Sequence, residues 1–326
     1  MQTEIRSKLL EAFSNAEGEF LSGQKISDLL GCSRTAIWKH MEELRKEGYE
    51  LEAVRRRGYR IKRKPDKVSG NEISLGLHTQ FMGRNIHFEE EVTSTQKIAH
   101  KLANAGAKEG TIVIAEQQIE GRGRLARVWY SPKYTGIWMS MIIRPKIPLN
   151  QTPQLTLLTA VAIVQAIEKV TGLFPDIKWP NDILINGKKV VGILTELQAE
   201  ADQVHSVIIG TGINVNQRRE DFHEDLKSIA TSIAAESGEK CDRSLLIQEI
   251  LIHFENLYEQ YLRSGFKPIK LLWESYAISL NKEIVAKTLQ GTLKGKALGI
   301  DDEGILLLQT GEGKIEKIYS ADIKIK

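Results

Sequence analysis

The residues with the clearest chemical potential form a basic, glycine-containing segment in the first half of the chain. Gly121-Arg122-Gly123-Arg124 follows an apolar stretch and is itself followed by Arg127 and Trp129. Glycine lets a backbone approach a ligand closely, and guanidinium groups bind carboxylates and phosphates. The segment therefore predicts an anion-binding loop, with a solvated basic turn as the structural alternative.

Gly121, Gly123 and Ala126 also match the dinucleotide fingerprint G-x-G-x-x-G/A. That fingerprint requires a helix directly after the loop, because the helix N-terminus binds the pyrophosphate. The residues that follow are β-rich and reach Pro132, so we reject a dinucleotide site. The chain also lacks the G-x-x-x-x-G-K-[ST] pattern, which excludes a P-loop.

Two later segments add an amide, a carboxylate and lysines near strands. Trp179-Pro180-Asn181-Asp182 combines an aromatic residue, a rigid turn, an amide and a carboxylate just before a strand. Lys188 and Lys189 are expected on a turn that leads into a strand containing Gly192. Asp182 is suited to Mg²⁺ or a ribose, and Lys189 to phosphate and carboxylate oxygens. A hairpin with a polar turn is the alternative.

Two weaker segments complete the set of candidate binding residues. Gly210 to Asn216, which includes Asn214, is expected to end a strand in a glycine-rich polar turn. Ser94-Thr95-Gln96 opens a predicted helix. Ser94 is there either a simple N-cap or part of a ligand-binding helix N-terminus.

These segments belong to a body in which strands and helices do not alternate regularly. A mixed, largely antiparallel sheet with helices on it fits this order better than a doubly wound fold. Strands are expected over 86–92, 111–116, 137–143, 183–185, 190–197 and 204–209, and helices over 95–105, 154–170, 243–263 and 268–275.

The start of the chain predicts a helix-turn-helix over about residues 23–42. One short helix ends at Gly31, and Ser33 is placed to cap the next, which Gly48 stops. Helix, glycine-containing turn and helix are typical of DNA-binding modules. An earlier helix is predicted around Ile5 to Phe13, so the helix capped by Ser33 is the third, and its apolar face is assigned to Ile37, Trp38, Met41 and Leu44.

A basic wing follows the helices. Strands are expected over 49–54 and 59–61, on either side of Arg55-Arg56-Arg57-Gly58. In a DNA-binding module, the third helix would contact the base edges of DNA and the wing would contact the DNA backbone. A basic protein-interaction domain is the alternative. The residues expected at DNA are Ser33, Arg34, Thr35, Lys39, His40, Arg55, Arg56 and Arg57.

Three domains are expected. The polar run Lys62 to Asn71 marks a boundary, and from Asn281 onward short strands alternate with turns at Gly291, 301–304 and 311–313. Such a pattern predicts a small closed or sandwiched β unit. The expected domains are 1–65, 72–278 and 279–326.

Composition places the protein in the cytoplasm. Hydrophobic residues at 41% and charged residues at 27% describe an ordinary globular chain. Cys32 and Cys241 are expected to be free thiols, and the histidines form no zinc-like cluster. The N-terminal sequence lacks the apolar region of a signal peptide, and Leu155 to Ile167 is too short to span a bilayer.

Taken together, the segments resemble the biotin–protein ligases, in the bifunctional bacterial class that also represses the biotin operon. Ser94 to Gln96, Glu116 to Gln118, the basic loop, Trp179 to Asp182, Lys188 to Leu194 and Gly210 to Asn216 occur in the family's order and spacing. The sequence departs from the family at Ala126, where a glycine is common, and at Gln96, where asparagine is frequent.

The resemblance implies an α+β fold with three parts. These are an N-terminal winged helix-turn-helix, a class II synthetase-like biotin/lipoate ligase domain built on a mixed β-sheet with helices, and a small C-terminal β-barrel. It also implies an enzyme that uses ATP and Mg²⁺ to form biotinyl-5'-AMP. The biotin then passes to a lysine of a biotin carrier protein domain, an acetyl-CoA carboxylase subunit.

The resemblance also assigns the site residues. Arg122, Arg124 and Lys189 are the catalytic residues, and Asp182 is the candidate Mg²⁺ ligand. Biotin is assigned to Ser94, Thr95, Gln96, Gln118, Gly121, Arg122, Gly123, Arg124, Lys189 and Gly192, and the nucleotide to Arg124, Arg127, Trp129, Asn181, Asp182, Lys189 and Asn214.

The implied partners are the carrier domain, operator DNA of biotin genes, and a second copy of the chain when biotinyl-AMP is bound as corepressor. No membrane is implied. A biotin-sensing repressor without catalysis and a lipoate–protein ligase are the competing interpretations. The two loop arginines, Asp182 and Lys189 argue against the first, and the basic loop with the DNA-binding module favours biotin over lipoate.

Overall fold

The computed structural model describes residues 2–16, 18–46, 48–63, 66–200, 203–311 and 313–325. The chain divides into two compact units, Met1–Leu77 and His78–Lys326. Expectations that fall on residues 64, 65 and 312 lie outside the described residues.

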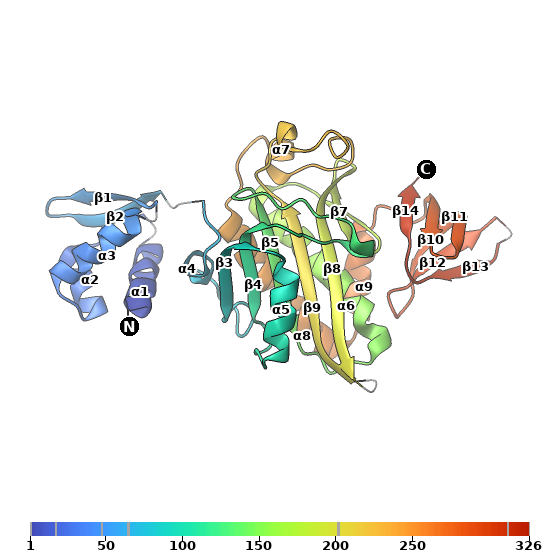
Figure 1. The fold of residues 1–326 in the computed structure, drawn as a ribbon, viewed down its shortest axis with the longest axis horizontal. Helices are drawn as coiled ribbons and strands as arrows, with labels where there is room; N and C mark the ends of the chain where they lie inside the picture. Colours follow the sequence, from blue (N-terminus) through green and yellow to red (C-terminus); the bar gives the residue numbers. More distant parts are fainter. Residues whose placement is uncertain are drawn as a thin grey trace. The chain divides into compact units, whose positions relative to one another are not determined.

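The first unit contains the predicted helix-turn-helix and hairpin (Figure 1). Gly31 ends the second helix with a left-handed φ of 60°, a conformation that glycine adopts without strain. The Ala36 N–H donates to Ser33 Oγ at 3.3 Å, so Ser33 caps the third helix as expected. The elements are α1 (Gln2–Asn15), α2 (Gly23–Leu30), α3 (Arg34–Lys46), β1 (Glu50–Val54), β2 (Gly58–Arg63) and α4 (Gly70–Ser74).

The apolar face of α3 differs from the prediction at two positions. Trp38 is 57% exposed, whereas His40 is 7% exposed and lies 3.3 Å from Glu43. Each helical residue advances by about 100°, which places residue 40 on the side of the buried Ile37 and Leu44 and residue 38 outside it. Trp38 was therefore wrongly assigned to the core, and His40 wrongly to the exposed DNA-binding face.

The polar run from Lys62 to Asn71 is not one continuous linker. β2 extends to Arg63, and α4 begins at Gly70. Ser69 caps α4 by accepting the Glu72 N–H at 3.4 Å, and Ile73 is fully buried. Local capping and a buried side chain therefore order a segment whose composition suggested only a boundary.

The second unit is built on a seven-stranded sheet with the order β3-β4-β5-β9-β8-β7-β6. Only β3 and β4 are parallel, so the mixed, largely antiparallel sheet is confirmed. β6 had no counterpart in the sequence analysis. The strands are β3 (Ile86–Val92), β4 (Ile112–Gln118), β5 (Gly136–Ile143), β6 (Asp176–Lys178), β7 (Asp182–Ile185), β8 (Lys188–Glu200) and β9 (Gln203–Asn214).

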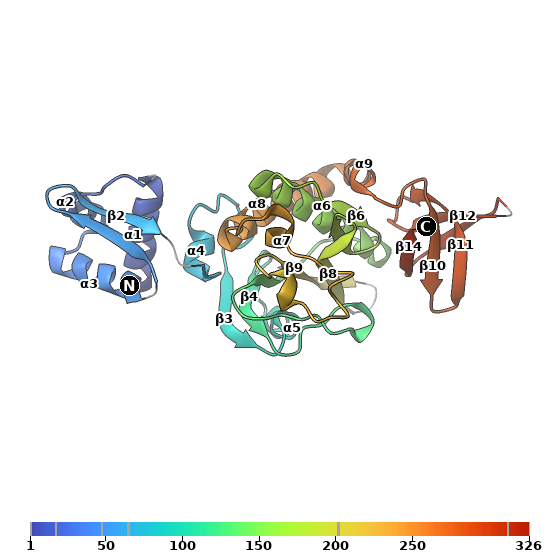
Figure 2. The same cartoon turned by 90° about the horizontal axis from the view of Figure 1, so that it is seen from above.

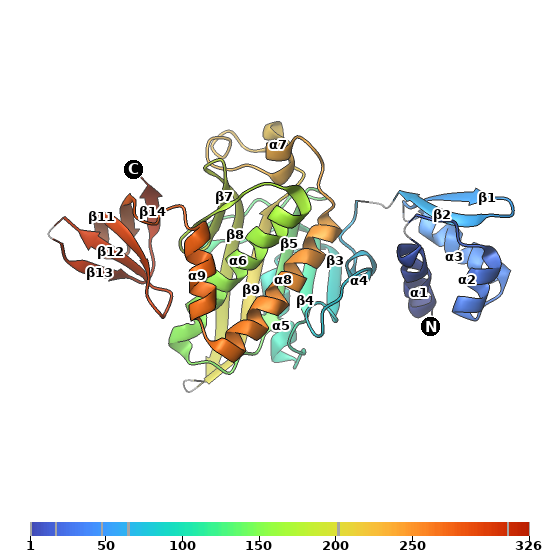
Figure 3. The same cartoon turned by 180° about the vertical axis from the view of Figure 1, so that it is seen from behind.

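Helices cover both faces of this sheet (Figures 2 and 3). α5 (Thr95–Asn104) lies on one face, and α6 (Thr152–Thr171), α8 (Arg243–Ser264) and α9 (Lys267–Tyr276) lie on the other. α7 (Ile233–Ser237) is a short helix between β9 and α8 in the chain. α6 is apolar enough to cross a membrane by length and composition, but it packs against α8 and is mostly buried as a core helix.

The last strands form a five-stranded antiparallel sheet with the order β13-β12-β11-β10-β14. β14 therefore pairs with β10 and lies at the opposite edge of this sheet from β13. Its core side chains include Ala297, Leu308 and Ile323. The strands are β10 (Glu283–Thr288), β11 (Gly291–Ile300), β12 (Leu306–Thr310), β13 (Ile315–Ile318) and β14 (Asp322–Ile325).

A fully buried ion pair fixes α8 to the sheet. Arg243 Nη1 lies 2.7 Å from Glu116 Oε2 and also donates to the Gly136 carbonyl at 3.0 Å. Both side chains have no exposed surface. A buried charge is tolerated only with a counter-charge and hydrogen bonds, so the pair specifies how the start of α8 meets β4 and β5.

Arg243→Met removes the counter-charge of Glu116 without opening a large cavity. We expect the free energy of unfolding to fall by about 3–5 kcal/mol, measured by urea denaturation. The double variant Glu116→Leu/Arg243→Met should recover much of that loss, because no charge remains buried. A loss below about 1 kcal/mol in Arg243→Met would contradict the assigned role.

Candidate active site

Glycines on two neighbouring strands make room for an aromatic ring. Gly192 of β8 lies opposite Gly212 of β9. A Cβ on Gly212 would lie 2.4 Å from Trp129 Nε1, and one on Gly192 would lie 2.8 Å from Trp129 Cζ3. The two glycines thus form a trough for the ring, and side chains larger than hydrogen would displace Trp129 from it.

This contact corrects one expectation. Gly210 to Asn214 are not a turn but the last residues of β9, which pairs with β5 and β8 over this stretch. Gly210 likewise leaves room for the Gln96 side chain, since a Cβ on Gly210 would lie 2.6 Å from Gln96 Oε1. The glycines resembled turn signals because sequence alone does not show a ring or an amide packed against a strand.

A buried polar network lies beside the glycine strands. Gln118 Oε1 accepts from the Thr95 N–H at 2.9 Å, and the Thr95 hydroxyl lies 2.8 Å from Ser140 Oγ. Ser140 Oγ donates to Gln96 Oε1 at 3.0 Å. Ser94 is buried at the N-cap position of α5, but its side chain makes no capping hydrogen bond. The simple capping role considered for Ser94 is therefore wrong.

Ser140 belongs to this network although the sequence analysis missed it. It lies in β5, whose residues are all buried, and its own side chain has no exposed surface. One hydroxyl in an otherwise apolar strand was the available signal, because buried polar groups need partners and often have a specific purpose.

The basic segment forms a tight hairpin loop. The Gly123 N–H donates to the Arg127 carbonyl and the Trp129 N–H to the Gly121 carbonyl, both at 2.8 Å. No α-helix follows, which confirms that the dinucleotide interpretation was rightly rejected. Ala126 has a left-handed φ of 55°, a conformation that disfavours a side chain. This explains physically why a glycine would suit that position.

Two loop arginines are held by polar groups from other elements. Arg124 donates to Asn181 Oδ1 at 3.0 Å and to Ser320 Oγ at 2.5 Å. Burial lowers the pKa of the Arg124 guanidinium below its ordinary value. Arg127 forms an ion pair with Asp322 of β14; this hydrogen bond and charge raise the pKa of Arg127 and lower that of Asp322.

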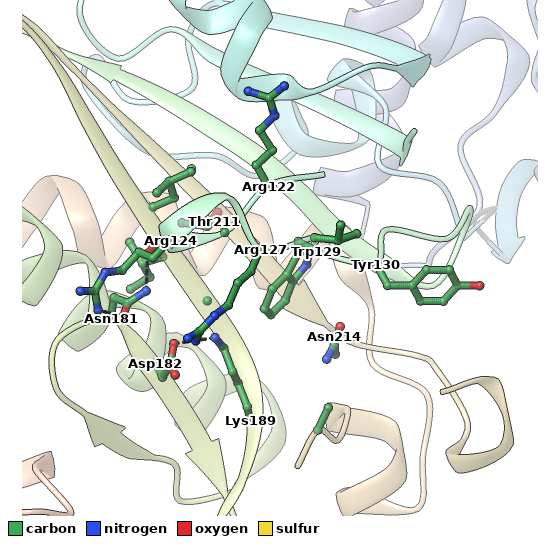
Figure 4. A pocket seen from close by; sticks show the side chains of 18 of the residues that line it. Arg122, Arg124, Arg127, Trp129, Tyr130, Asn181, Asp182, Lys189, Thr211 and Asn214 are labelled. Atoms are coloured by element: carbon green, nitrogen blue, oxygen red, sulfur yellow. Dashed lines mark hydrogen bonds and ion pairs between the residues drawn. The ribbon is translucent and has the colours of Figure 1, made fainter. Parts of the chain in front are cut away.

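Lys189 lies between a carboxylate and an aromatic ring. Its Nζ is 2.6 Å from Asp182 Oδ1 and 5.2 Å from the centre of the Trp129 ring. Figure 4 shows the Arg127 guanidinium directed toward Asp182 and Lys189. Arg122 instead points away from them, is exposed, and lies 3.8 Å from Glu120. The structure thus gathers Lys189, Asp182 and Arg127 but not Arg122.

Lys188 and Lys189 are the first residues of β8 rather than turn residues, and a loop pairs with Lys189. The Lys189 N–H donates to the Ile229 carbonyl at 2.8 Å, and the Thr231 N–H donates to the Lys189 carbonyl at 2.9 Å. Asn214 Nδ2 fixes the same loop through the Thr231 carbonyl at 3.1 Å. Sequence reasoning gave no sign of this loop.

Glu236 of α7 braces the loop from the other side. Its carboxylate accepts from Thr231 Oγ1 at 2.6 Å and from Asn186 Nδ2 at 2.5 Å. Burial raises the pKa of Glu236, but these hydrogen bonds and nearby positive charge outweigh burial and lower it overall. The carboxylate is therefore ionised near neutral pH and keeps the loop against β8.

One cavity of about 570 Å³, a size suited to a small ligand, is lined by the polar network, the loop arginines, Asp182, Lys189 and Asn214. Asn181 is anchored at its wall by donating to the Ile193 carbonyl at 2.8 Å. Gly121 is the only predicted ligand residue that does not line the cavity; a Cβ there would lie 2.3 Å from the Trp129 carbonyl. The lining also includes residues that sequence reasoning missed: Ser140, Lys178, Asp322 and Lys324.

Three family models match the chain. Residues 5–60 match the HTH domain, 89–214 the Biotin/lipoate A/B protein ligase family, and 279–325 the Biotin protein ligase C terminal domain. The "Bifunctional ligase/repressor BirA" of Bacillus subtilis is 62% identical over the whole of both chains. The protein of the same name from Escherichia coli is 29% identical over 95% of this chain and 94% of its own.

A solved structure agrees with these matches. The biotin protein ligase from Aquifex aeolicus in complex with biotin and ATP is 30% identical, covers 74% of this chain and 99% of its own, and superposes with a TM-score of 0.64.

Gly212→Ala should displace the Trp129 ring, because the added methyl group would lie 2.4 Å from Nε1. We expect a red-shifted tryptophan emission and at least a tenfold rise in the Kd for ATP, about 1.4 kcal/mol. Gly311→Ala is the matched control, since apart from its chain neighbours no described residue has an atom within 4 Å of the added Cβ. If the emission shift persists in a Trp129→Phe background, the ring is not its source and the assigned packing of Trp129 in the trough is wrong.

Proposed function

The chain belongs to the biotin/lipoate A/B protein ligase family, among its bifunctional ligase/repressors, and on that premise we propose that it adenylates biotin and transfers it to a carrier lysine. The observation that carries this proposal is one cavity that joins a buried polar network to clustered cations. The polar network suits a neutral ring with hydrogen-bonding groups, and the clustered cations suit a carboxylate and a phosphate. ATP and biotin are the substrates, and biotinyl-5'-AMP is the intermediate.

The polar network binds the ureido head of biotin. Ser94, Thr95 and Gln118 offer a hydroxyl, a second hydroxyl and an amide to its two N–H donors and its carbonyl. Gln96 is committed to Ser140 and to the Ile208 carbonyl, so it supports the pocket from behind. Gly123 and Gly192 both line the cavity, and we assign the valeryl chain to the space beside them.

In the first step, a biotin carboxylate oxygen attacks the α-phosphorus of ATP. The bond to the bridging oxygen breaks, and its electron pair leaves with pyrophosphate. Two anions must approach each other, so fixed positive charge lowers the barrier. Lys189 and Arg124 supply that charge at the acyl-phosphate, and Arg127 binds the nucleotide. In the structure Arg122 points away from Asp182 and Lys189. To act on the bound acid it must therefore move over it when the loop closes.

In the second step, the neutral ε-amine of a carrier lysine attacks the acyl carbon, the acyl–phosphate bond breaks with its electron pair going to AMP, and the nitrogen loses one proton to solvent. We assign the adenine to the flat Trp129 ring and to Asn214, which both line the cavity. Asn181 keeps Arg124 aimed at the phosphate. A closed loop also excludes water from the reactive anhydride.

Mg²⁺ binding is part of the proposal. Asp182 is the one carboxylate beside Lys189 at the phosphate position, and among the described residues no group of three or more His, Cys, Asp and Glu side chains gathers. One carboxylate fits Mg²⁺, which is commonly held by one or two carboxylates, water and substrate phosphates. Bound there, the ion would neutralise phosphate charge.

The first unit binds operator DNA through α3 and the wing. Exposed Trp38 replaces buried His40 on the DNA-facing side, and Ser33 serves as the helix cap. The proposed contacts are Arg34, Thr35, Trp38, Lys39, Arg55, Arg56 and Arg57. We further propose a cytoplasmic protein that dimerises when biotinyl-AMP is bound, domains at 1–65, 72–278 and 279–326, and closure of the last sheet into a small barrel.

Lys189→Ala should reduce biotin transfer by two to three orders of magnitude, the scale of losing one electrostatic stabiliser. The measurement is the rate at which a purified biotin carrier domain becomes biotinylated with ATP and Mg²⁺. Lys101→Ala, on the exposed end of α5, is the control and should transfer at the wild-type rate. Near-normal transfer by Lys189→Ala would remove this residue from the mechanism.

The triple variant Arg55→Ala/Arg56→Ala/Arg57→Ala should bind duplex DNA more weakly and with less salt dependence. The slope of log K against log salt should decrease by about 0.9 for each phosphate that the wing no longer neutralises. Fluorescence anisotropy with a mixed-sequence duplex measures both quantities. An unchanged slope would show that the wing does not contact the DNA backbone.

A further inference from the structure

A row of residues runs across the sheet from the Trp129 trough to its edge. Gly212 lies opposite Gly192, Gly192 opposite Asp182, and Asp182 opposite Lys178 of β6. Residues directly opposite on neighbouring strands share a face, with strands about 4.8 Å apart. Lys178 is therefore the next charged residue outward from the Asp182–Lys189 pair.

β14 approaches the same part of the cavity. Asp322 and Lys324 are two residues apart on one strand and so share a face, while Ile323 between them is 2% exposed. Both Asp322 and Lys324 line the cavity, as does Lys178. The positive charge of Lys178 contributes to the lowered pKa of Asp322, which is consistent with their proximity.

Lys178 and Lys324 differ from the other cavity cations in having no acceptor among the described residues. Lys189 is paired with Asp182, Arg127 with Asp322, and Arg124 is bound to Asn181 and Ser320. Within the described part of the chain, the ammonium groups of Lys178 and Lys324 make no hydrogen bond or ion pair. Lys178 is moreover half-buried, where a cation gains most from an anionic ligand.

We propose that Lys178 and Lys324 bind the β- and γ-phosphates of ATP, which leave together as pyrophosphate. This inference rests on the proposed function, because it extends that site outward from the α-phosphate. The row gives the order: base at Trp129, α-phosphate at Lys189, then Lys178 at the sheet edge, with Lys324 of β14 lining the same cavity.

The two lysines stabilise the leaving group. When the carboxylate oxygen bonds to the α-phosphorus, the electron pair of the breaking P–O bond goes to pyrophosphate. Ammonium groups on the β- and γ-oxygens bind that charge as it develops. In the reverse direction the same lysines hold pyrophosphate for attack on biotinyl-AMP.

The test is the KM for pyrophosphate in biotin-dependent ATP–pyrophosphate exchange. We expect Lys178→Met and Lys324→Met each to raise that KM by about tenfold or more. Lys178→Arg should restore most of the loss because it keeps the charge. The KM for biotin should not change, and neither should inhibition by AMP, which lacks both outer phosphates. Lys287→Met, exposed on β10, is the matched control.

A second measurement does not depend on catalysis. Calorimetric titration with inorganic tripolyphosphate should show weaker binding to Lys178→Met than to the wild type. If the wild type shows no exchange but binds tripolyphosphate more tightly than Lys178→Met does, the proposed reaction is wrong and the phosphate-binding role of Lys178 is supported. Unchanged pyrophosphate KM and unchanged tripolyphosphate binding, or an equal loss of AMP inhibition, would overturn the assignment of the lysines.

Discussion

Mutual repulsion among cations is the constraint around which the second unit is organised. Arg124, Arg127 and Lys189 face one cavity, and each is held by an oxygen from a different element. Like charges this close are tolerated only when neighbouring oxygens offset them. Oxygens of anionic substrates can take the places of these protein oxygens, so the cations are already arranged in the charge pattern that two anions require.

This constraint explains why three parts of the second unit meet at the cavity. β7 and β8 bring Asp182 and Lys189 together, the basic hairpin supplies the arginines, and β14 supplies Asp322. The small C-terminal sheet therefore contributes directly to the electrostatics of the site. Glu236 and Asn214 secure the loop at Lys189, which limits how far that cation can move.

Sequence predicted what local pattern controls and missed what depends on packing across the fold. The long elements and the basic loop were found because periodicity, capping and glycine spacing are local signals. The glycines of β9 were taken for a turn because the Trp129 ring that needs their space comes from a distant loop. Asp322 and Lys178 were missed because their importance comes from strand register and from a second sheet. On α3, the exchange of Trp38 and His40 shows that hydrophobicity alone does not settle which residues face a small core.

The most direct test of the central claim is ATP–pyrophosphate exchange by the wild-type protein with biotin, lipoate and octanoate supplied separately. We expect exchange with biotin alone, because the polar network offers partners for a ureido ring that the other two acids lack. Exchange with lipoate or octanoate at a comparable rate would contradict the assignment of the network. No exchange with any acid, despite biotin binding, would identify a sensor without adenylating activity.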